Sequence, residues 1–268
     1  MRYVQGVCRP KEDAGRSVET TRTGVNDNVQ QGIDLCCRGR YDEALQCFEL
    51  ALAEDPSLIG AIIGKASALD RLGLFSHALA CTDDALAREP RNPDAWYLRG
   101  AALYHKGALA EALEALHEAL AENPDHLEGW CIRGNCHFYL DEYDEAIACY
   151  DAVLAHTRDH PRAWYNRAVT LSDIRRYTEA LDSYDEVIRL NSDIASVWTN
   201  RGYCLAKLGR YEEAIVSFDR ALDLNPHDLM ALSDKAAALR RLGRENEAHA
   251  CIDRVRELAA GREPHTVL

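Results

Sequence analysis

The four tryptophans of this sequence keep a fixed spacing. They are Trp96, Trp130, Trp164 and Trp198, and each lies 34 residues after the previous one. A series of alanines keeps the same step across seven units: Ala44, Ala78, Ala112, Ala146, Ala180, Ala214 and Ala248. Because 34 residues are too many for one helix or strand of ordinary length, this period predicts a repeated supersecondary unit.

The stretch from Ala195 to Asp228 shows what one unit contains. It has two short amphipathic patterns separated by a turn at Gly209-Arg210. The second pattern stops at Asn225-Pro226, because proline lacks an amide hydrogen and clashes with the preceding helical turn. A single helical hairpin of this size cannot bury its apolar face, so the units are expected to stack on one another.

The pattern of residues within the unit resembles the tetratricopeptide repeat (TPR) family. In this stretch the matching residues are Trp198, Arg201-Gly202, Leu205, Ala214, Phe218, Ala221 and Pro226. The resemblance implies an all-α fold, a right-handed α-solenoid of about seven TPR helix-turn-helix repeats over residues 25–262. The repeats are expected to start near residues 25, 59, 93, 127, 161, 195 and 229. Residues 1–24 are predicted to form a disordered or weakly ordered N-terminal tail, and residues 263–268 a C-terminal tail.

The charge balance disfavours two classes of partner. The chain has 44 acidic and 31 basic residues, for a formal net charge of −13. Nucleic acids and anionic membrane surfaces both attract basic faces, so neither is an expected partner. No apolar run approaches the ~18 residues of a membrane span, and the N-terminus does not resemble a secretory signal. A cytoplasmic location is therefore expected.

The ten cysteines mostly follow the repeat. Two places in the unit hold six of them, and alanine, serine or threonine fills the same places in other units: Cys47, Cys81, Cys149 and Cys251 at one place, and Cys136 and Cys204 at the other. This pattern is typical of small buried side chains and not of metal ligands. His117-Glu118 lacks the second histidine of a helical zinc site. We therefore predict no metal, no cofactor and no enzymatic activity.

Basic and acidic residues also recur with the period. The basic series is Lys65, Arg99, Arg133, Arg167, Arg201 and Lys235, and the acidic series is Glu49, Asp83, Asp151, Asp185, Asp219 and Asp253, with His117 interrupting the acids. Two matched series of opposite charge favour a structural ladder of ion pairs between hairpins. The alternative is a basic ladder that contacts a ligand.

The TPR resemblance implies that the first helix of each hairpin lines a concave groove. On that face, helical spacing places Cys131, His105 and a set of aromatic and amide residues. We predict that this set forms a peptide-binding groove: Tyr97, Tyr104, Asn135, Phe138, Tyr139, Tyr165, Asn166, Asn200, Tyr203 and Lys207. Tyrosine offers a large contact area with a polar end, and asparagine can pair with a peptide backbone. The alternative is that several of these residues serve only packing.

The predicted function is a non-catalytic scaffold that binds a protein or peptide. The carboxylate clamp with which some TPR proteins hold chaperone tails is not expected. Asn135 and Asn166 match its asparagines, but Cys131, Ser196 and Asn200 stand where its cations should be. Two other functions remain open. One is a self-associating assembly module that forms a weak homodimer through its terminal repeats, and the other is a regulatory partner of a separate enzyme.

Overall fold

The computed structural model describes residues 22–261. These residues form fourteen α-helices and no strand. The helices are α1 (Arg22–Cys37), α2 (Tyr41–Glu54), α3 (Ile59–Arg71), α4 (Phe75–Arg88), α5 (Pro93–Lys106), α6 (Leu109–Glu122), α7 (Leu127–Tyr139), α8 (Tyr143–His156), α9 (Pro161–Asp173), α10 (Tyr177–Leu190), α11 (Ala195–Lys207), α12 (Tyr211–Leu224), α13 (Leu229–Arg241) and α14 (Glu245–Ala259). The predicted C-terminal tail lies outside the described residues, as does most of the N-terminal tail.

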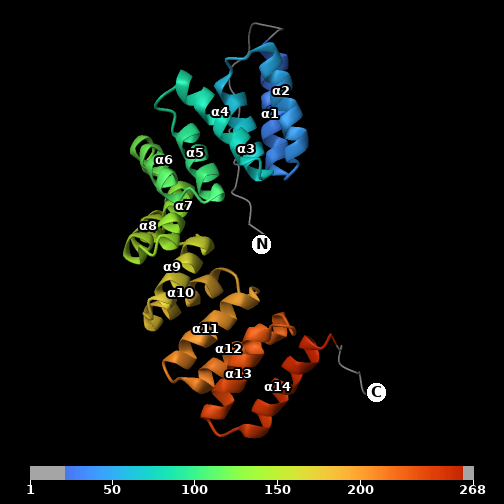
Figure 1. Ribbon diagram of the computed structural model, residues 1–268, viewed down its shortest axis with the longest axis vertical. Helices are drawn as coiled ribbons and strands as arrows, with labels where there is room; N and C mark the ends of the chain where they lie inside the picture. Colours follow the sequence, from blue (N-terminus) through green and yellow to red (C-terminus); the bar gives the residue numbers. More distant parts are fainter. Residues whose placement is uncertain (1–21, 262–268) are drawn as a thin grey trace. The chain divides into compact units, whose positions relative to one another are not determined.

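The helices follow the sequence period. Every even-numbered helix begins 34 residues after the previous even-numbered one, from α2 at Tyr41 to α14 at Glu245. Within each of the pairs α1/α2, α3/α4, α5/α6, α9/α10, α11/α12 and α13/α14, the two helices pack against each other (Figure 1). Proline supplies some of the boundaries. Pro93 and Pro161 open α5 and α9, where a missing amide hydrogen does no harm, and α12 ends just before Asn225-Pro226.

The chain divides into two compact units, one ending at Cys136 and the other beginning at His137. In the first unit, the buried ring of Phe48 packs where a Cβ atom on Gly32 or Gly64 would stand. In the second unit, the buried ring of Phe218 occupies the same place relative to Gly202. Large and small residues at matched repeat positions therefore allow close packing of helices.

The turns inside the hairpins use a left-handed backbone. Five of them hold a glycine with φ between 73° and 81°: Gly39, Gly73, Gly107, Gly209 and Gly243. At the same repeat place, two turns hold Asp141 with φ 60° and Arg175 with φ 63°. Glycine adopts this conformation without steric conflict, whereas an L side chain is strained there.

Each tryptophan side chain is hydrogen-bonded to the loop that precedes its helix. The indole Nε1 atom donates a hydrogen bond to the carbonyl oxygen of the residue six positions earlier. The donor–acceptor distances are 2.9 Å for Trp96 to Pro90, 2.8 Å for Trp130 to Pro124, 2.9 Å for Trp164 to Arg158 and 2.8 Å for Trp198 to Ser192. The recurring tryptophan therefore fixes the connection between hairpins as well as filling space.

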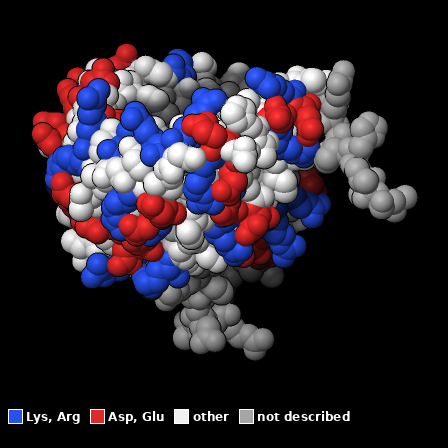
Figure 2. All heavy atoms as spheres, turned by 90° about the horizontal axis from the view of Figure 1, so that it is seen from below, with Lys and Arg blue, Asp and Glu red and all other residues white. Residues whose placement is uncertain are grey.

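The predicted ladder of structural ion pairs is confirmed. Five cations of the odd-numbered helices pair with the acid sixteen residues earlier: Lys65 with Glu49 at 2.9 Å, Arg99 with Asp83, Arg167 with Asp151 at 2.6 Å, Arg201 with Asp185 at 2.7 Å and Lys235 with Asp219. Arg133, which stands opposite His117 in the series, lies over the Trp130 ring at 5.3 Å. On the face shown in Figure 2, basic and acidic side chains are interspersed.

The predicted packing role is confirmed for five of the six periodic cysteines, whereas Cys81 is only partly buried. Cys47, Cys149 and Cys251 are buried at one repeat place, and Cys136 and Cys204 are buried at the other. Burial raises the pKa of the Cys204 thiol, as expected for a cysteine used as a small apolar side chain. No helix within residues 22–261 has both the length and the apolar character that a membrane span requires.

Candidate binding cleft

The ten residues of the predicted groove all keep some contact with solvent. None of them is buried, and Tyr139 is 63 % exposed. Tyr97, Tyr104 and Asn135 belong to the first unit, and the other seven belong to the second. These positions are therefore accessible within each unit, which a purely internal packing role does not require.

In the first unit, the predicted residues adjoin histidines. The Tyr97 ring lies 4.2 Å from the His126 ring, centroid to centroid, and the Tyr104 ring lies 5.3 Å from that of His105. The His105 Nδ1 atom is 2.9 Å from the Oδ1 atom of the buried Asp70 carboxylate, which joins α5 to α3. These contacts fix the orientation of the aromatic rings.

The prediction that Cys131 faces the groove is wrong, because its side chain is buried. Its repeat place holds Tyr97 and Tyr165 in two other hairpins, where both rings are partly exposed, but Cys131 itself is completely buried. The thiol is short and does not project beyond its larger neighbours. Thr199, also small, is buried at the same place in α11. Helical spacing therefore gives the direction of a side chain, whereas its size decides whether it reaches the surface.

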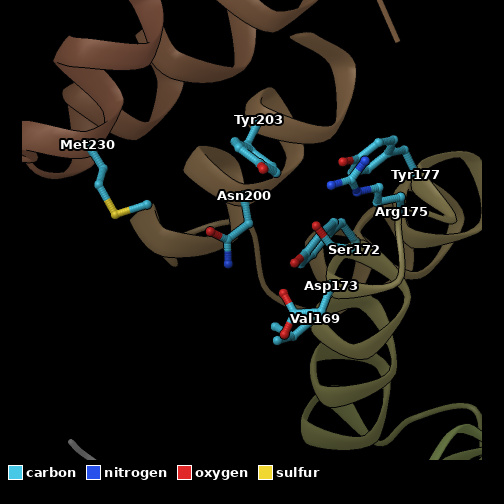
Figure 3. A pocket seen from close by; sticks show the side chains of 9 residues that line it. Val169, Ser172, Asp173, Arg175, Tyr177, Asn200, Tyr203 and Met230 are labelled. Carbon is cyan, nitrogen blue, oxygen red and sulfur yellow. The ribbon is translucent and has the colours of Figure 1, made fainter. Parts of the chain in front are cut away.

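The second unit contains a cleft of about 390 Å³ (Figure 3). It lies between the first helices of successive hairpins, α9, α11 and α13. Asn200 and Tyr203 of the predicted groove line it, on α11. The other lining residues come from α9, the turn after it, α10 and α13: Val169, Ser172, Asp173, Arg175, Tyr177, Tyr184 and Met230. A cleft of this size can hold several side chains or a short extended segment.

Asn200 lies at the centre of a polar wall in this cleft. Its Nδ2 atom is 3.5 Å from the Tyr165 hydroxyl oxygen, and the Tyr165 ring contacts that of Tyr184 edge-on at 6.3 Å. Burial raises the pKa of the Tyr184 hydroxyl, against a hydrogen bond from Asn200 that lowers it. The hydroxyl group therefore stays protonated, and the wall presents neutral polar groups.

Tyr203 forms an aromatic wall of the same cleft. Its ring meets that of Tyr177 edge-on at 6.3 Å, and the Lys207 ammonium group lies over it, 4.9 Å from the centroid. The structure therefore brings together Tyr165, Asn200, Tyr203 and Lys207. Phe138 and Tyr139 form a separate cluster, with ring centroids 5.5 Å apart.

The sequence interpretation missed two charged residues of the cleft, Asp173 and Arg175. Much of Asp173 is exposed, but partial enclosure of its carboxyl group raises its pKa by burial. Arg175 occupies the turn place at which five other hairpins have glycine. This interruption of the glycine series is visible in the sequence and is the signal that could have identified the residue.

The lining groups can bind a ligand by hydrogen bonds, aromatic contact and charge. Among residues 22–261, no three side chains of the His, Cys, Asp and Glu types gather in a way that could hold a metal ion. Hydroxyl, amide, aromatic and charged side chains line the cleft.

Comparison with known families agrees with this architecture. Models described as tetratricopeptide repeat match residues 38–102, 133–193 and 195–228. The chain is a TPR protein. A further family model, described as subunit 3 of the anaphase-promoting complex or cyclosome, matches residues 71–153. Comparison of the TPR protein with curated protein sequences found no match.

Solved structures share the fold. PilF of Pseudomonas aeruginosa is 20% identical, with a TM-score of 0.72, and the alignment covers 82% of this chain and 100% of that one. TTC0263, described as a thermophilic TPR protein of Thermus thermophilus, is 28% identical over 68% of this chain and 99% of that one, with a TM-score of 0.58. YrrB, described as a TPR protein with an unusual peptide-binding site, is 22% identical over 69% and 95%, with a TM-score of 0.60.

Proposed function

We propose that this TPR protein is a non-catalytic scaffold that binds a peptide or protein segment along the first helices of its hairpins. In this proposal, residues 25–262 form a right-handed solenoid of about seven repeats, whose concave groove carries the ten predicted residues. The observation that carries the proposal is the cleft of the second unit, because Asn200 and Tyr203 line it and are partly exposed.

The chemistry of the cleft supports a peptide ligand. The faces of Tyr177 and Tyr203 offer apolar contact area, and tyrosine is enriched in protein interfaces. Asn200 carries both a donor and an acceptor, as does each peptide group of an extended chain. YrrB, which shares the fold, is itself described as having a peptide-binding site.

The proposed location of the protein is the cytoplasm.

The proposed ligand is not a chaperone tail. A terminal carboxylate would need cations at the clamp positions, which here hold Cys131, Ser196 and Asn200. Cys131 is buried as well as uncharged, so it cannot supply the charge.

The test is a selection of peptides on the full chain. A phage-displayed library of random peptides is passed over the immobilised protein, and enriched peptides are synthesised and titrated by fluorescence anisotropy. Tyr203→Ala should weaken binding about tenfold or more, as expected when an aromatic anchor is removed. Val216→Ala, at a position on α12 that is 65 % exposed and does not line the cleft, is the matched control and should bind normally.

Two measurements decide the outcome. Circular dichroism of Tyr203→Ala should match that of the wild type, so that loss of binding reflects the cleft and not the fold. Failure of the wild type to select any peptide would overturn the proposal, and concentration-dependent dimers in sedimentation would then favour self-association through the terminal repeats.

A further inference from the structure

Arg175 holds a strained backbone conformation at the edge of the cleft. Its φ of 63° lies in the left-handed region, where a Cβ atom crowds the backbone. Five other hairpins avoid this strain with glycine at the same place. Residues kept in strained conformations concentrate at functional sites, so an arginine here calls for a role that glycine could not perform.

Local contacts do not account for the arginine. Asp141, the other non-glycine residue at this place, accepts a hydrogen bond from the Tyr143 hydroxyl at 2.6 Å, and aspartate tolerates the left-handed region better than most residues. Within residues 22–261, the Arg175 guanidinium has neither an ion pair nor a side-chain hydrogen bond. Its neighbour Arg176, by contrast, pairs with Glu179 at 2.6 Å.

The side chain of Arg175 is directed into the cleft. Figure 3 shows the guanidinium group beside Tyr177, pointing toward Tyr203. Met230, which is 61 % exposed, lines the opposite part of the cleft. The strained turn therefore places an unpaired cation beside aromatic surface and across from an apolar side chain.

We infer that Arg175 is a specificity-determining residue that binds an acidic side chain of an extended peptide lying in this cleft. The inference rests on the proposed peptide-binding function. The planar guanidinium can donate two parallel hydrogen bonds to a carboxylate, and its charge becomes more effective where the peptide excludes water. The net charge of −13 disfavours non-specific attraction of acidic peptides, so their binding depends on local cations such as Arg175.

Other lining residues limit which peptides fit. Asp173, on the α9 side of the cleft, would repel a second acidic side chain placed against it. The exposed thioether of Met230 can adapt to an apolar side chain. The expected ligand is therefore an extended segment with an acidic residue toward Arg175, an apolar residue toward Met230, and no acidic residue toward Asp173.

The experiment compares peptides selected by several variants from one phage-displayed random library. The full-length wild type should enrich peptides with aspartate or glutamate at one position, at least about threefold over the starting library. Arg175→Gln should lose that preference and bind the wild-type peptides about tenfold more weakly. Arg220→Gln removes the same charge from α12, outside the cleft, and should keep both the preference and the affinity.

Two further variants separate recognition from folding. Arg175→Glu should reverse the preference, so that lysine or arginine is enriched at the same position. Arg175→Gly relieves the strained turn, and we expect its thermal midpoint to rise while the acidic preference disappears.

The possible failures are distinguishable. A wild type that selects peptides without an acidic position, or an Arg175→Gln variant that keeps the preference, would overturn the role of Arg175 and leave the proposed function standing. A wild type that selects no peptide would overturn the proposed function, and this inference with it.

Discussion

Two histidines act as hydrogen-bond acceptors at the first turns of α7 and α9. The Nδ1 atom of His126 accepts from the Gly129 amide at 2.9 Å, and that of His160 accepts from the Ala163 amide at 3.1 Å. These bonds satisfy amide groups that a helix leaves without a partner at its N-terminus. A ring nitrogen accepts a hydrogen bond only when it carries no proton, so both contacts require neutral histidine.

This requirement makes stability depend on pH. Burial lowers the pKa of both histidines below the unfolded value near 6.5. At a pH between the folded and the unfolded pKa, the unfolded chain binds more protons than the folded protein. The stability that the two histidine caps contribute is therefore complete above about pH 6.5 and is lost as the pH falls through the folded pKa. Each cap contributes about 1 kcal/mol. The double variant His126→Asn, His160→Asn should therefore lose less stability than the wild type between about pH 7.5 and about pH 5 in urea unfolding.

The chain provides its own control for this prediction. Asn92 stands at the same repeat place and accepts from the Ala95 amide at 3.0 Å, without a proton to gain in this range. Asn92→His should add to the acid sensitivity. Equal pH dependence in the wild type and the double variant would show that the two histidine caps are not its source.

At the scale of elements, arginines of the ladder join three consecutive helices. Arg201 on α11 donates from Nε to Asp185 of α10 at 2.7 Å and from Nη1 to the Ser217 hydroxyl of α12 at 2.8 Å. Arg167 on α9 repeats this arrangement with Asp151 at 2.6 Å and Ser183 at 2.7 Å. The second hydrogen bond depends on the forked geometry of the guanidinium group, which lysine lacks.

This geometry predicts unequal effects of the same substitution. Arg201→Lys keeps the charge near Asp185 but loses the bond to Ser217, and should reduce the free energy of unfolding by about 1 kcal/mol. Arg99→Lys is the matched control, because Arg99 has Ala115 at the corresponding place and only its pairing with Asp83 is altered. A partly exposed pair contributes about 0–1 kcal/mol, so the loss there should be the smaller of the two.

Urea unfolding of the two variants at one pH checks this prediction. Equal losses would mean that the serine hydroxyl contributes nothing beyond the ion pair. The chain itself uses lysine at Lys65 and Lys235, where the place of Ser217 is taken by Cys81 and Cys251.

At the scale of the whole molecule, the sequence predicts whatever recurs. The hairpins, the turn glycines and the ion pairs each place one residue type in one environment several times, so the period alone reveals them. The proposed recognition depends on residue types that recur at most twice at one repeat place, as Tyr97 and Tyr165 do. Helical spacing predicts a groove-facing Cys131, although the side chain is buried, because the spacing carries no information on how far a side chain projects. The sequence does not predict Arg175, because its side-chain direction follows from a strained turn and from neighbours in other helices. The indole hydrogen bonds of the tryptophans end on backbone carbonyl groups, which leave no trace in the sequence.

A repeat protein of this kind should lose structure locally. Each helical pair is stabilised chiefly by its sequence neighbours, so damage in one place should not spread along the chain. Phe48 is buried in the packing between α1, α2 and α3. Its ring occupies the space in which a Cβ atom on Gly32 or Gly64 would stand. Phe48→Ala should remove about 3–5 kcal/mol of local stability. We expect hydrogen exchange to accelerate in α1 to α4 while α11 to α14 keep their protection.

Phe218→Ala supplies the reciprocal measurement. Phe218 is equally buried, in the core of the second unit, and its loss should accelerate exchange in α11 and α12 and leave α1 to α4 unchanged. Hydrogen exchange followed by mass spectrometry resolves the two regions in one experiment. If either substitution accelerated exchange evenly along the whole chain, the repeats would form one cooperative unit, because the loss of one hairpin would then remove the support of all the others.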